Sequence, residues 1–335
     1  MQPFGATILD ATGLRLSVDE KAFFRDVRPF GFILFARNID TPDQVRALCD
    51  EFREAAGHEA VITIDQEGGR VQRMSAPYWR DWTPPLALAE RTGDQAPEAF
   101  YLMYRIIAHE LASVGIDSNC APLIDVASAQ THRFLRNRCY GETPGQVAEI
   151  GRAVSDGLLA GGVLPVMKHM PGHGRATLDS HHDLPRVDAR RIDLEAVDFA
   201  PFRALRDLPM GMTAHLVYDA LAKGPATLSP EVMRIVREDI GFDNLVMTDD
   251  ISMKALRQSP AESTRAALAA GCDVALYCNG PLAERQAVAE AAGEMTPAAQ
   301  TRALRAMAAR RTADEIDIDA LSAQFETLSG GVLHG

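Results

Sequence analysis

Residues 162–174 of the chain read GVLPVMKHMPGHG, and residues 179–185 read DSHHDLP. The first six residues form an apolar run typical of a buried strand, and glycine and proline keep the rest from forming a helix. Histidines, a lysine and aspartates are therefore concentrated directly after a strand. In α/β folds, loops at the carboxyl ends of strands carry reactive side chains. The alternative is a surface loop that is merely rich in histidine, and we favour the functional interpretation.

Seven further apolar runs are separated by segments of helical periodicity. We expect strands at 6–9, 32–35, 61–64, 116–121, 163–167, 210–214, 245–248 and 274–277. We expect the main helices at 97–114, 144–160, 192–206, 230–240, 261–270 and 283–292, with another beginning near 42 and one in the tail after 313. Eight strands alternating with helices predict a single-domain (β/α)8 TIM barrel over residues 1–335. A doubly wound open sheet would give a similar pattern.

Polar residues at the predicted strand ends favour the barrel. They are Asp10, Arg37, Asp65, Asp125, Lys168 with His169, His215 and Asp249. The carboxyl ends of barrel strands meet at one mouth, so we expect these side chains to line a single pocket. An open sheet would spread them along its edge, and each one alone could be a solvated residue where a strand meets a loop.

The composition of the 335 residues argues against several classes of partner. A net charge of −12 disfavours nucleic acid and anionic membranes, which bind basic surfaces. The five cysteines show no CxxC spacing, which fits a reducing compartment. We find neither a signal peptide nor an apolar run of the ~20 residues that a membrane span needs. We expect a cytoplasmic monomer that acts on a small molecule and uses no cofactor or metal.

Residues 65–73, DQEGGRVQR, follow the third predicted strand. A carboxylate, a Gly-Gly turn and two arginines suit a polyhydroxylated ligand, because carboxylates accept paired hydroxyl hydrogen bonds and arginine donates in a fixed fork. The alternative is that the glycines only form a turn and the charges pair with one another. The glycine pattern of phosphate-binding loops is missing.

Two pairs of residues suit acid–base and nucleophilic chemistry. Asp249 and Asp250 end the seventh strand, where side chains alternate, so one can enter the mouth as a nucleophile while the other supports the next turn. Both would also suit a helix N-terminus. Asp179 and His181 are two residues apart, so the carboxylate can fix the imidazole, which can then donate a proton and later accept one. On composition alone, His182 is an equally good candidate.

These motifs resemble those of glycoside hydrolase family 3, in its short bacterial branch of NagZ-type β-N-acetylglucosaminidases. The motifs are KHMPGHG with DSHHDLP, DQEGGRVQR, NRCYGETP at 137–144 and MTDDISM at 247–253. They follow the family's order over roughly residues 30–280. The resemblance implies a barrel that cleaves terminal β-linked GlcNAc with retention of configuration. It also implies a cytoplasmic enzyme of cell-wall recycling that acts on GlcNAc-1,6-anhydro-MurNAc and its peptides.

The resemblance also implies roles for single residues. Asp249 matches the nucleophile, and His181 matches the general acid/base, with Asp179 as its partner. The sugar-binding positions match Asp65, Arg73, Arg138, Lys168 and His169. The Asp–His dyad would replace the second carboxyl group of most retaining glycosidases. We expect the 172–182 loop to be mobile, with Gly172–Gly174 as its hinge, so that it carries His181 to the sugar.

Departures from the family pattern concern the substrate more than the reaction. They are Met170, Arg175 and Cys139-Tyr140, and none occupies a proposed catalytic position. Some relatives with the same dyad are phosphorylases, so a β-GlcNAc phosphorylase is one alternative.

Two further alternatives lie outside the family. A metal-dependent barrel hydrolase would use His169, His173, His181 or His182 with Asp249, although the chain has no HxH or HExxH motif. A non-enzymatic sugar-binding protein would explain the sugar ligands but would leave Asp249 and the dyad without a role.

Overall fold

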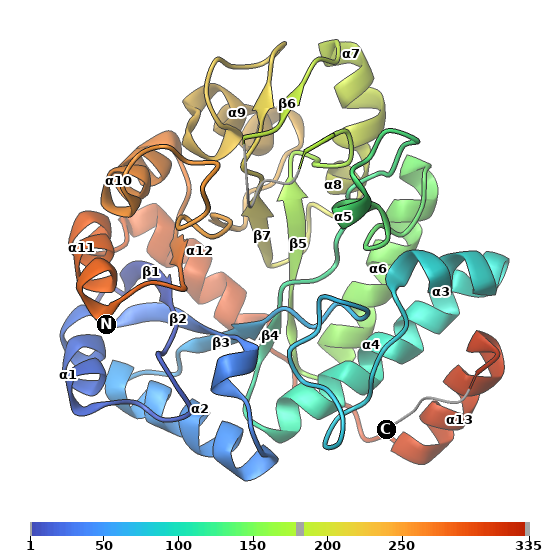
Figure 1. Ribbon diagram of the computed structural model, residues 1–335, viewed down its shortest axis with the longest axis horizontal. Helices are drawn as coiled ribbons and strands as arrows, with labels where there is room; N and C mark the ends of the chain where they lie inside the picture. The colour runs from blue at the N-terminus through green and yellow to red at the C-terminus, as the bar shows by residue number, and fades with distance from the viewer. Residues whose placement is uncertain (1, 179–183, 332–335) are drawn as a thin grey trace.

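Eight parallel strands form the centre of the computed structural model, which describes residues 2–178 and 184–331 (Figure 1). They are β1 (Gly5–Leu9), β2 (Pro29–Leu34), β3 (Val61–Ile64), β4 (Ser118–Asn119), β5 (Leu164–Met170), β7 (Met210–Thr213), β9 (Leu245–Met247) and β10 (Ala275–Tyr277). A separate two-stranded parallel sheet consists of β6 (Arg186–Val187) and β8 (Val217–Tyr218).

The eight strands close into a barrel. Hydrogen-bonded neighbours follow the orders β10-β1-β2-β3 and β4-β5-β7-β9. Backbone bonds from Asp117 N to Ile62 O (3.1 Å) and from Cys120 N to Ile64 O (2.8 Å) join the β3 and β4 segments. A parallel bridge between Met247 and Val274 joins β9 to the segment of β10. The predicted (β/α)8 TIM barrel is therefore confirmed, and the open sheet is excluded because the ring closes.

Helices cover the outside of the barrel (Figure 1). Those between successive barrel strands include α1 (Val18–Val27), α2 (Pro42–Ala56), α4 (Ala96–Ser113), α6 (Pro144–Ala160), α8 (Ala200–Ala204), α9 (Pro230–Arg234) and α10 (Pro260–Ala270). After the last strand come α11 (Leu282–Ala292), α12 (Pro297–Ala308) and α13 (Ile318–Ser329). Shorter helices in the connections are α3 (Pro85–Thr92), α5 (Arg133–Arg136) and α7 (Arg191–Asp193).

The elements differ from the predicted ones in several respects. The strands β6 and β8 and the helix α5 were not predicted, and the helix predicted over 230–240 is divided into α9 and a π-helical turn at 235–239. Periodicity missed α1, α3 and α12, although a capping box between Ser17 and Glu20 marks the start of α1. The helix predicted over 192–206 is divided into α7, a π-helical turn at 194–198 and α8. Strand β5 extends beyond the predicted end at residue 167, so Lys168 and His169 lie within the strand and not in the loop.

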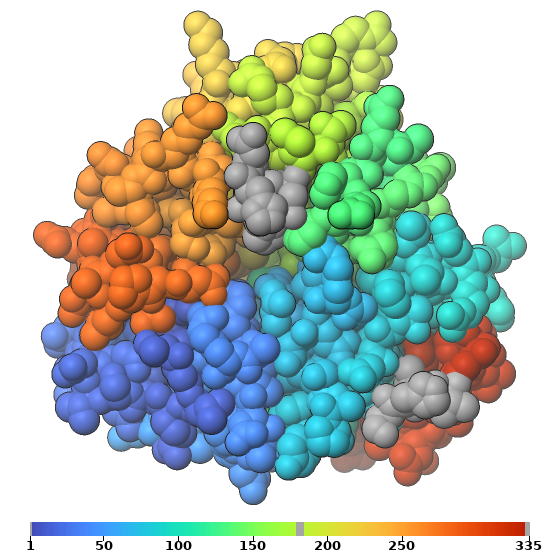
Figure 2. Space-filling view, viewed as in Figure 1, coloured from blue at the N-terminus to red at the C-terminus, as the bar shows by residue number. Residues whose placement is uncertain are grey.

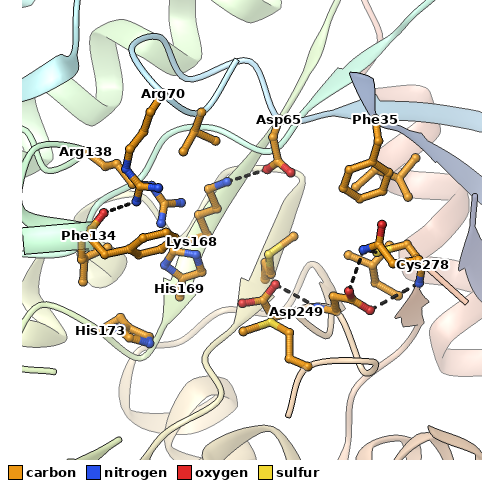
Figure 3. Close-up of a pocket in the computed structure, with 18 of the residues that line it drawn as sticks. Phe35, Asp65, Arg70, Phe134, Arg138, Lys168, His169, His173, Asp249 and Cys278 are labelled. Carbon is orange, nitrogen blue, oxygen red and sulfur yellow. Dashed lines mark hydrogen bonds and ion pairs between the residues drawn. The ribbon is translucent and has the colours of Figure 1, made fainter. Parts of the chain in front are cut away.

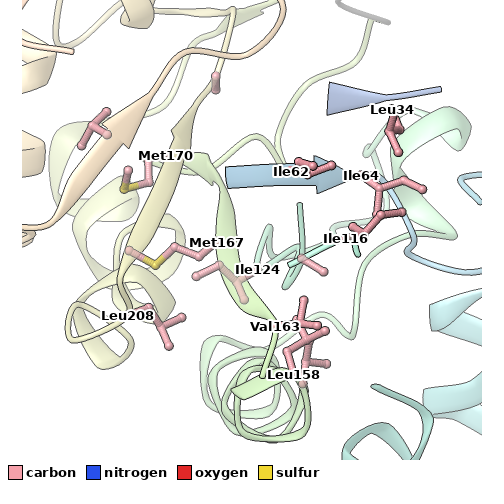
Figure 4. Close-up of a cluster of buried hydrophobic side chains, with 14 of the residues drawn as sticks. Leu34, Ile62, Ile64, Ile116, Ile124, Leu158, Val163, Met167, Met170 and Leu208 are labelled. Carbon is pink, nitrogen blue, oxygen red and sulfur yellow. The ribbon is translucent and has the colours of Figure 1, made fainter. Parts of the chain in front are cut away.

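Strand residues alternate between two apolar layers, which explains how the mouth receives its polar groups. The inner layer fills the barrel and includes Val61, Val166 and Met247. The outer layer packs against the helices and includes Ile62, Ile64 and Met167 (Figure 4). Side chains two residues apart on a strand point to the same side. Lys168 and Asp249 therefore continue the inner positions of β5 and β9 into the mouth.

Distant parts of the chain surround one face of the molecule. In Figure 2 the colours from blue through green and yellow to orange run around this face in sequence order, so segments from most of the chain border its centre. All five cysteines are buried and free. Within residues 2–178 and 184–331, no helix has the length and apolar character needed to cross a membrane.

Candidate active site

A cavity of about 320 Å³ lies at the carboxyl ends of the barrel strands (Figure 3). Six of the eight predicted site residues line it: Asp65, Arg73, Arg138, Lys168, His169 and Asp249. An apolar wall completes it, formed by Ile33, Phe35, Met212, Leu276 and Cys278. Small-molecule sites combine apolar walls with a few placed polar groups, and this volume is at the low end of their range. The cavity suits a ligand about the size of one sugar ring.

Five charged residues form a continuous chain of ion pairs, here called the charge chain. Arg73 pairs with Asp65 (3.2 Å), and Asp65 pairs with Lys168 (2.8 Å). Behind the cavity lining, Glu67 pairs with Lys168 (2.6 Å) and binds Arg138 through both carboxylate oxygens (2.7 and 2.8 Å). Such pairs fix the direction of each donor and acceptor before a ligand arrives.

The ion pairs keep the buried members of the charge chain ionised. Burial raises the pKa of Glu67, but Arg138 and Lys168 outweigh it and bring that pKa to about 2. Burial also raises the pKa of Asp65, yet Lys168 and Arg73 hold it well below its usual range. For Lys168, burial lowers the pKa, but the two carboxylates raise it above its ordinary value. At neutral pH the cations can therefore donate to ligand hydroxyls and Asp65 can accept from them.

Asp125 determines the tautomer of His169. Its Oδ2 lies 2.7 Å from His169 Nδ1, and its Oδ1 accepts the backbone N–H of His173 at 2.6 Å. Burial raises the pKa of Asp125, but the His169 ring outweighs burial and keeps that pKa below its ordinary value. An ionised carboxylate only accepts hydrogen bonds, so His169 Nδ1 carries a proton and Nε2 is the ring atom available to a ligand.

Asp249 and Asp250 follow the end of β9 and differ in their contacts. Both border the cavity. Asp249 Oδ1 accepts the backbone N–H of Asp250 at 2.8 Å. The Asp250 carboxylate is bound into the next turn, where it accepts from Ser252 N–H (2.9 Å), Ser252 O–H (2.6 Å) and Cys278 N–H (3.3 Å).

The expectation that all polar strand-end residues line the pocket is wrong for Asp10, Arg37, Asp125 and His215. Asp10 pairs with Arg37 and with Arg285. Asp125 binds two histidines from behind, and His215 binds Thr227 and the Asp250 carbonyl. Asp10, Asp125 and His215 are fully buried, and such groups must find hydrogen-bond partners within the protein. These residues support the mouth and do not face the cavity.

Comparison with known proteins decides the family. The family model described as "Glycosyl hydrolase family 3 N terminal domain" matches residues 9–309. The chain belongs to glycosyl hydrolase family 3. It is therefore a glycosidase, and the family predicted from the sequence motifs is confirmed.

Relatives of this family 3 chain are similar over most of its length. A β-hexosaminidase from Methylococcus capsulatus is 36% identical over 324 residues, 95% of each chain. A β-hexosaminidase from Alkalilimnicola ehrlichii is 36% identical over 284 residues, 83% of this chain and 81% of the relative. Among solved structures, NagZ from Neisseria gonorrhoeae in complex with N-trifluoroacetyl-D-glucosamine has a TM-score of 0.84 at 28% identity, covering 98% of this chain and 96% of that one.

Two predicted residues of the family 3 site, Asp179 and His181, lie outside the described residues, as does the last part of the 172–182 loop, from residue 179 on. The described start of that loop shows why its glycines are needed. A Cβ on Gly172 would lie 2.8 Å from Asp198 Cβ, and one on Gly174 would lie 1.9 Å from the Val126 carbonyl oxygen. Close packing of the backbone therefore requires both glycines, and their role as a hinge stays a prediction.

Glu67 is a site residue that the sequence reasoning missed. It is 1% exposed and joins Lys168 to Arg138 at the centre of the charge chain. Its place two residues after Asp65, directly before a Gly-Gly turn with positive φ angles of 97° and 59°, was a visible signal. Nothing in the one-dimensional pattern, however, indicated its partners.

His173 is a buried histidine that borders the cavity of the family 3 site. Its Nδ1 has no hydrogen-bond partner among the described residues. Burial, helped by the nearby His169 ring, lowers the pKa of His173 from 6.5 to about 4. The ring is therefore neutral at physiological pH, which suits a hydrogen bond to an uncharged ligand and opposes a role as a charged acid.

We predict that His173 makes the fold sensitive to mild acid. Between pH 6.5 and 4 the unfolded chain binds a proton at this position more readily than the folded chain does, so the free energy of unfolding falls as the pH drops. From pH 7 to pH 5 this loss should be about 2 kcal/mol larger in the wild type than in His173→Asn. Urea unfolding of both proteins at the two pH values measures the difference, and equal losses would contradict the assignment.

No group of three or more His, Cys, Asp and Glu side chains is placed to hold a metal ion in the described part of the chain. His169 and His173 lie close together, with ring centroids 5.5 Å apart. Asp125 nevertheless occupies one nitrogen of His169 and the backbone N–H of His173. The two histidines are therefore held by hydrogen bonds to Asp125 in the wall of the cavity.

Proposed function

We propose that the chain is a retaining β-N-acetylglucosaminidase that removes terminal β-linked GlcNAc through a covalent glycosyl-aspartate intermediate. The observation that carries this proposal is the placement of Asp249 in the same cavity as the charge chain and His169. The carboxylate can attack while the charged wall orients the sugar hydroxyls. The similarity to β-hexosaminidases and to NagZ supports the same reaction.

The proposed reaction has two balanced steps. In the first, Asp249 bonds to the anomeric carbon, the glycosidic C–O bond breaks, and His181 gives its proton to the leaving oxygen. In the second, water adds to the anomeric carbon, His181 takes the water's proton, and the Asp249 ester bond breaks. Asp179 would hold the His181 ring in the required tautomer. The two displacements together retain the configuration of the sugar.

The mouth of the cavity suits a leaving group that carries a carboxylate. Arg70 is exposed there, and its guanidinium carbon lies 3.5 Å from the centre of the Phe134 ring, which also borders the cavity. A cation stacked on an aromatic ring is held in place and offers planar donors to a carboxylate. We therefore propose peptidoglycan fragments as substrates, GlcNAc-1,6-anhydro-MurNAc and its peptides, and a role in cytoplasmic cell-wall recycling.

The first test is turnover of p-nitrophenyl β-GlcNAc, followed by NMR to assign the configuration of the first-formed sugar. We expect release of nitrophenol and of β-GlcNAc, at a rate that chelators do not change. Formation of GlcNAc 1-phosphate in phosphate buffer would show that the chain is the phosphorylase instead. Loss of activity on chelation would indicate the metal-dependent hydrolase, and lack of turnover would indicate a sugar-binding protein.

We predict that His181→Ala slows the enzyme according to how much its leaving group needs a proton. General acid catalysis contributes about 10²–10⁴-fold, and nitrophenolate needs little of it. The loss should therefore be near the upper value for GlcNAc-1,6-anhydro-MurNAc and far smaller for bond cleavage in the nitrophenyl substrate. His182→Ala is the matched control and should keep both activities. If the two variants behave in the reverse way, His182 is the acid/base.

A further inference from the structure

Five polar residues at the ends of β1, β2, β7, β9 and β10 form a second set of contacts, here called the strand-end network: Asp10, Arg37, His215, Asp250 and Asn279. Asn279 is its junction. Its backbone N–H donates to Asp10 Oδ2 (2.9 Å), its Oδ1 accepts from Arg37 (2.8 Å), and its Nδ2 donates to Asp250 Oδ2 (3.3 Å). Neither the charge chain nor the proposed dyad uses these contacts.

The backbone of Asn279 fits this junction. Its φ of 68° is in the left-handed region, which asparagine tolerates better than most residues. Asp10, to which it binds, is fully buried and is held from behind by Arg285 (2.6 Å), itself 2% exposed. The network is thus anchored on one side in the rigid wall of the barrel.

On the other side of the network, His215 holds the turn that contains Asp249 and Asp250. Its Nε2 lies 3.0 Å from the Asp250 carbonyl oxygen, and its Nδ1 lies 2.8 Å from Thr227 Oγ1. Burial lowers the pKa of His215, so the ring is neutral at physiological pH and carries one proton. A carbonyl oxygen only accepts, so that proton is on Nε2.

These contacts meet at Asp250, through both its backbone and its side chain. Its carbonyl is fixed by His215, and its carboxylate is fixed by Ser252, Cys278 and Asn279. Its N–H donates to Asp249 Oδ1 at 2.8 Å. We infer that the strand-end network positions Asp249, by holding the Asp250 N–H where it orients the Asp249 carboxylate toward the anomeric carbon. This inference rests on the proposed role of Asp249 as the nucleophile. The network residues act through Asp249 as positioning residues, and two of them, Asp250 and Asn279, also border the cavity.

His215 offers a matched pair of variants. A glutamine amide reaches about as far as Nε2, so His215→Gln can still donate to the Asp250 carbonyl. An asparagine amide reaches only about as far as Nδ1, so His215→Asn can contact Thr227 but not the turn. We expect His215→Asn to lower kcat on the order of 10- to 10²-fold, the scale of a small misplacement of a reacting group. We expect His215→Gln to recover most of that loss.

Asp250 and Asn279 offer a second test by exchange. Asp250→Asn places two amide groups against each other and should lower kcat roughly 10-fold. The double variant Asp250→Asn with Asn279→Asp restores a donor–acceptor pair in the opposite direction, and aspartate also keeps the contact with Arg37. We expect the exchange to recover most of the lost kcat.

The readouts separate positioning from loss of structure. For each variant we would measure kcat, the inhibition constant of free GlcNAc, the melting temperature, and the rate at which an activated fluorosugar labels Asp249. The inference predicts slower labelling with an inhibition constant and melting temperature near wild type. It is overturned if activity follows melting temperature in all variants, or if Gln and the exchange recover nothing. Labelling of another residue in the wild type would instead refute the proposed function.

Discussion

Replacing Asp249 by asparagine should lower turnover of p-nitrophenyl β-GlcNAc by about 10⁴-fold or more, the scale of losses when a covalent nucleophile is removed. The amide oxygen can still accept the Asp250 N–H that binds Asp249 Oδ1 in the structure, so the fold should be unaffected. The loss should therefore appear in kcat, while the inhibition constant of GlcNAc stays near the wild-type value.

The Asp249→Asn experiment needs a control and a chemical confirmation. Asp43→Asn changes an aspartate whose side chain is 95% exposed on α2, and it should keep full activity. In the wild type, an activated fluorosugar should add one sugar to the protein, and peptide mapping should place it on Asp249. Full activity of Asp249→Asn, or an adduct elsewhere, would refute the proposed mechanism.

The second large effect is expected from Lys168→Met. Lys168 is 2% exposed and separates two carboxylates, with Asp65 at 2.8 Å and Glu67 at 2.6 Å. Removal of one member of a buried ion pair typically costs about 3–5 kcal/mol, because it leaves an uncompensated charge. Arg73 and Arg138 still pair with the two carboxylates, so we expect a destabilisation near the lower value.

The same variant should lose ligand binding as well. A hydrogen bond to a charged group contributes about 1.5–3 kcal/mol, so the inhibition constant of GlcNAc should rise roughly 10- to 10²-fold. Urea unfolding measures the first effect, and titration under native conditions measures the second. Lys223→Met, at an exposed lysine, is the control for both. Wild-type stability together with wild-type affinity would show that the charge chain has no such role.

Much of the architecture could be predicted from the sequence because local patterns encode it. Alternation of apolar runs with helical segments predicted the barrel, and the apolar runs at 61–64 and 210–214 match β3 and β7 closely. Glycine, proline and the capping residues act on their immediate neighbours, so the turns and helix ends that they cause can be predicted from the sequence alone. The motifs around Asp65, Lys168 and Asp249 also predicted the family, since each is a short continuous segment.

The tertiary structure alone decided which polar side chains face the cavity and which support it. Lys168 and Asp65 are 103 residues apart in the chain, and their contact depends on which strands are neighbours and in what register. Asp10 and Arg37 looked like pocket residues, but they do not line the cavity: they pair with each other and with Asn279, which does. A sequence specifies the chemistry of each strand end through local pattern. The partner of each group depends on distances between strands, which no local pattern contains.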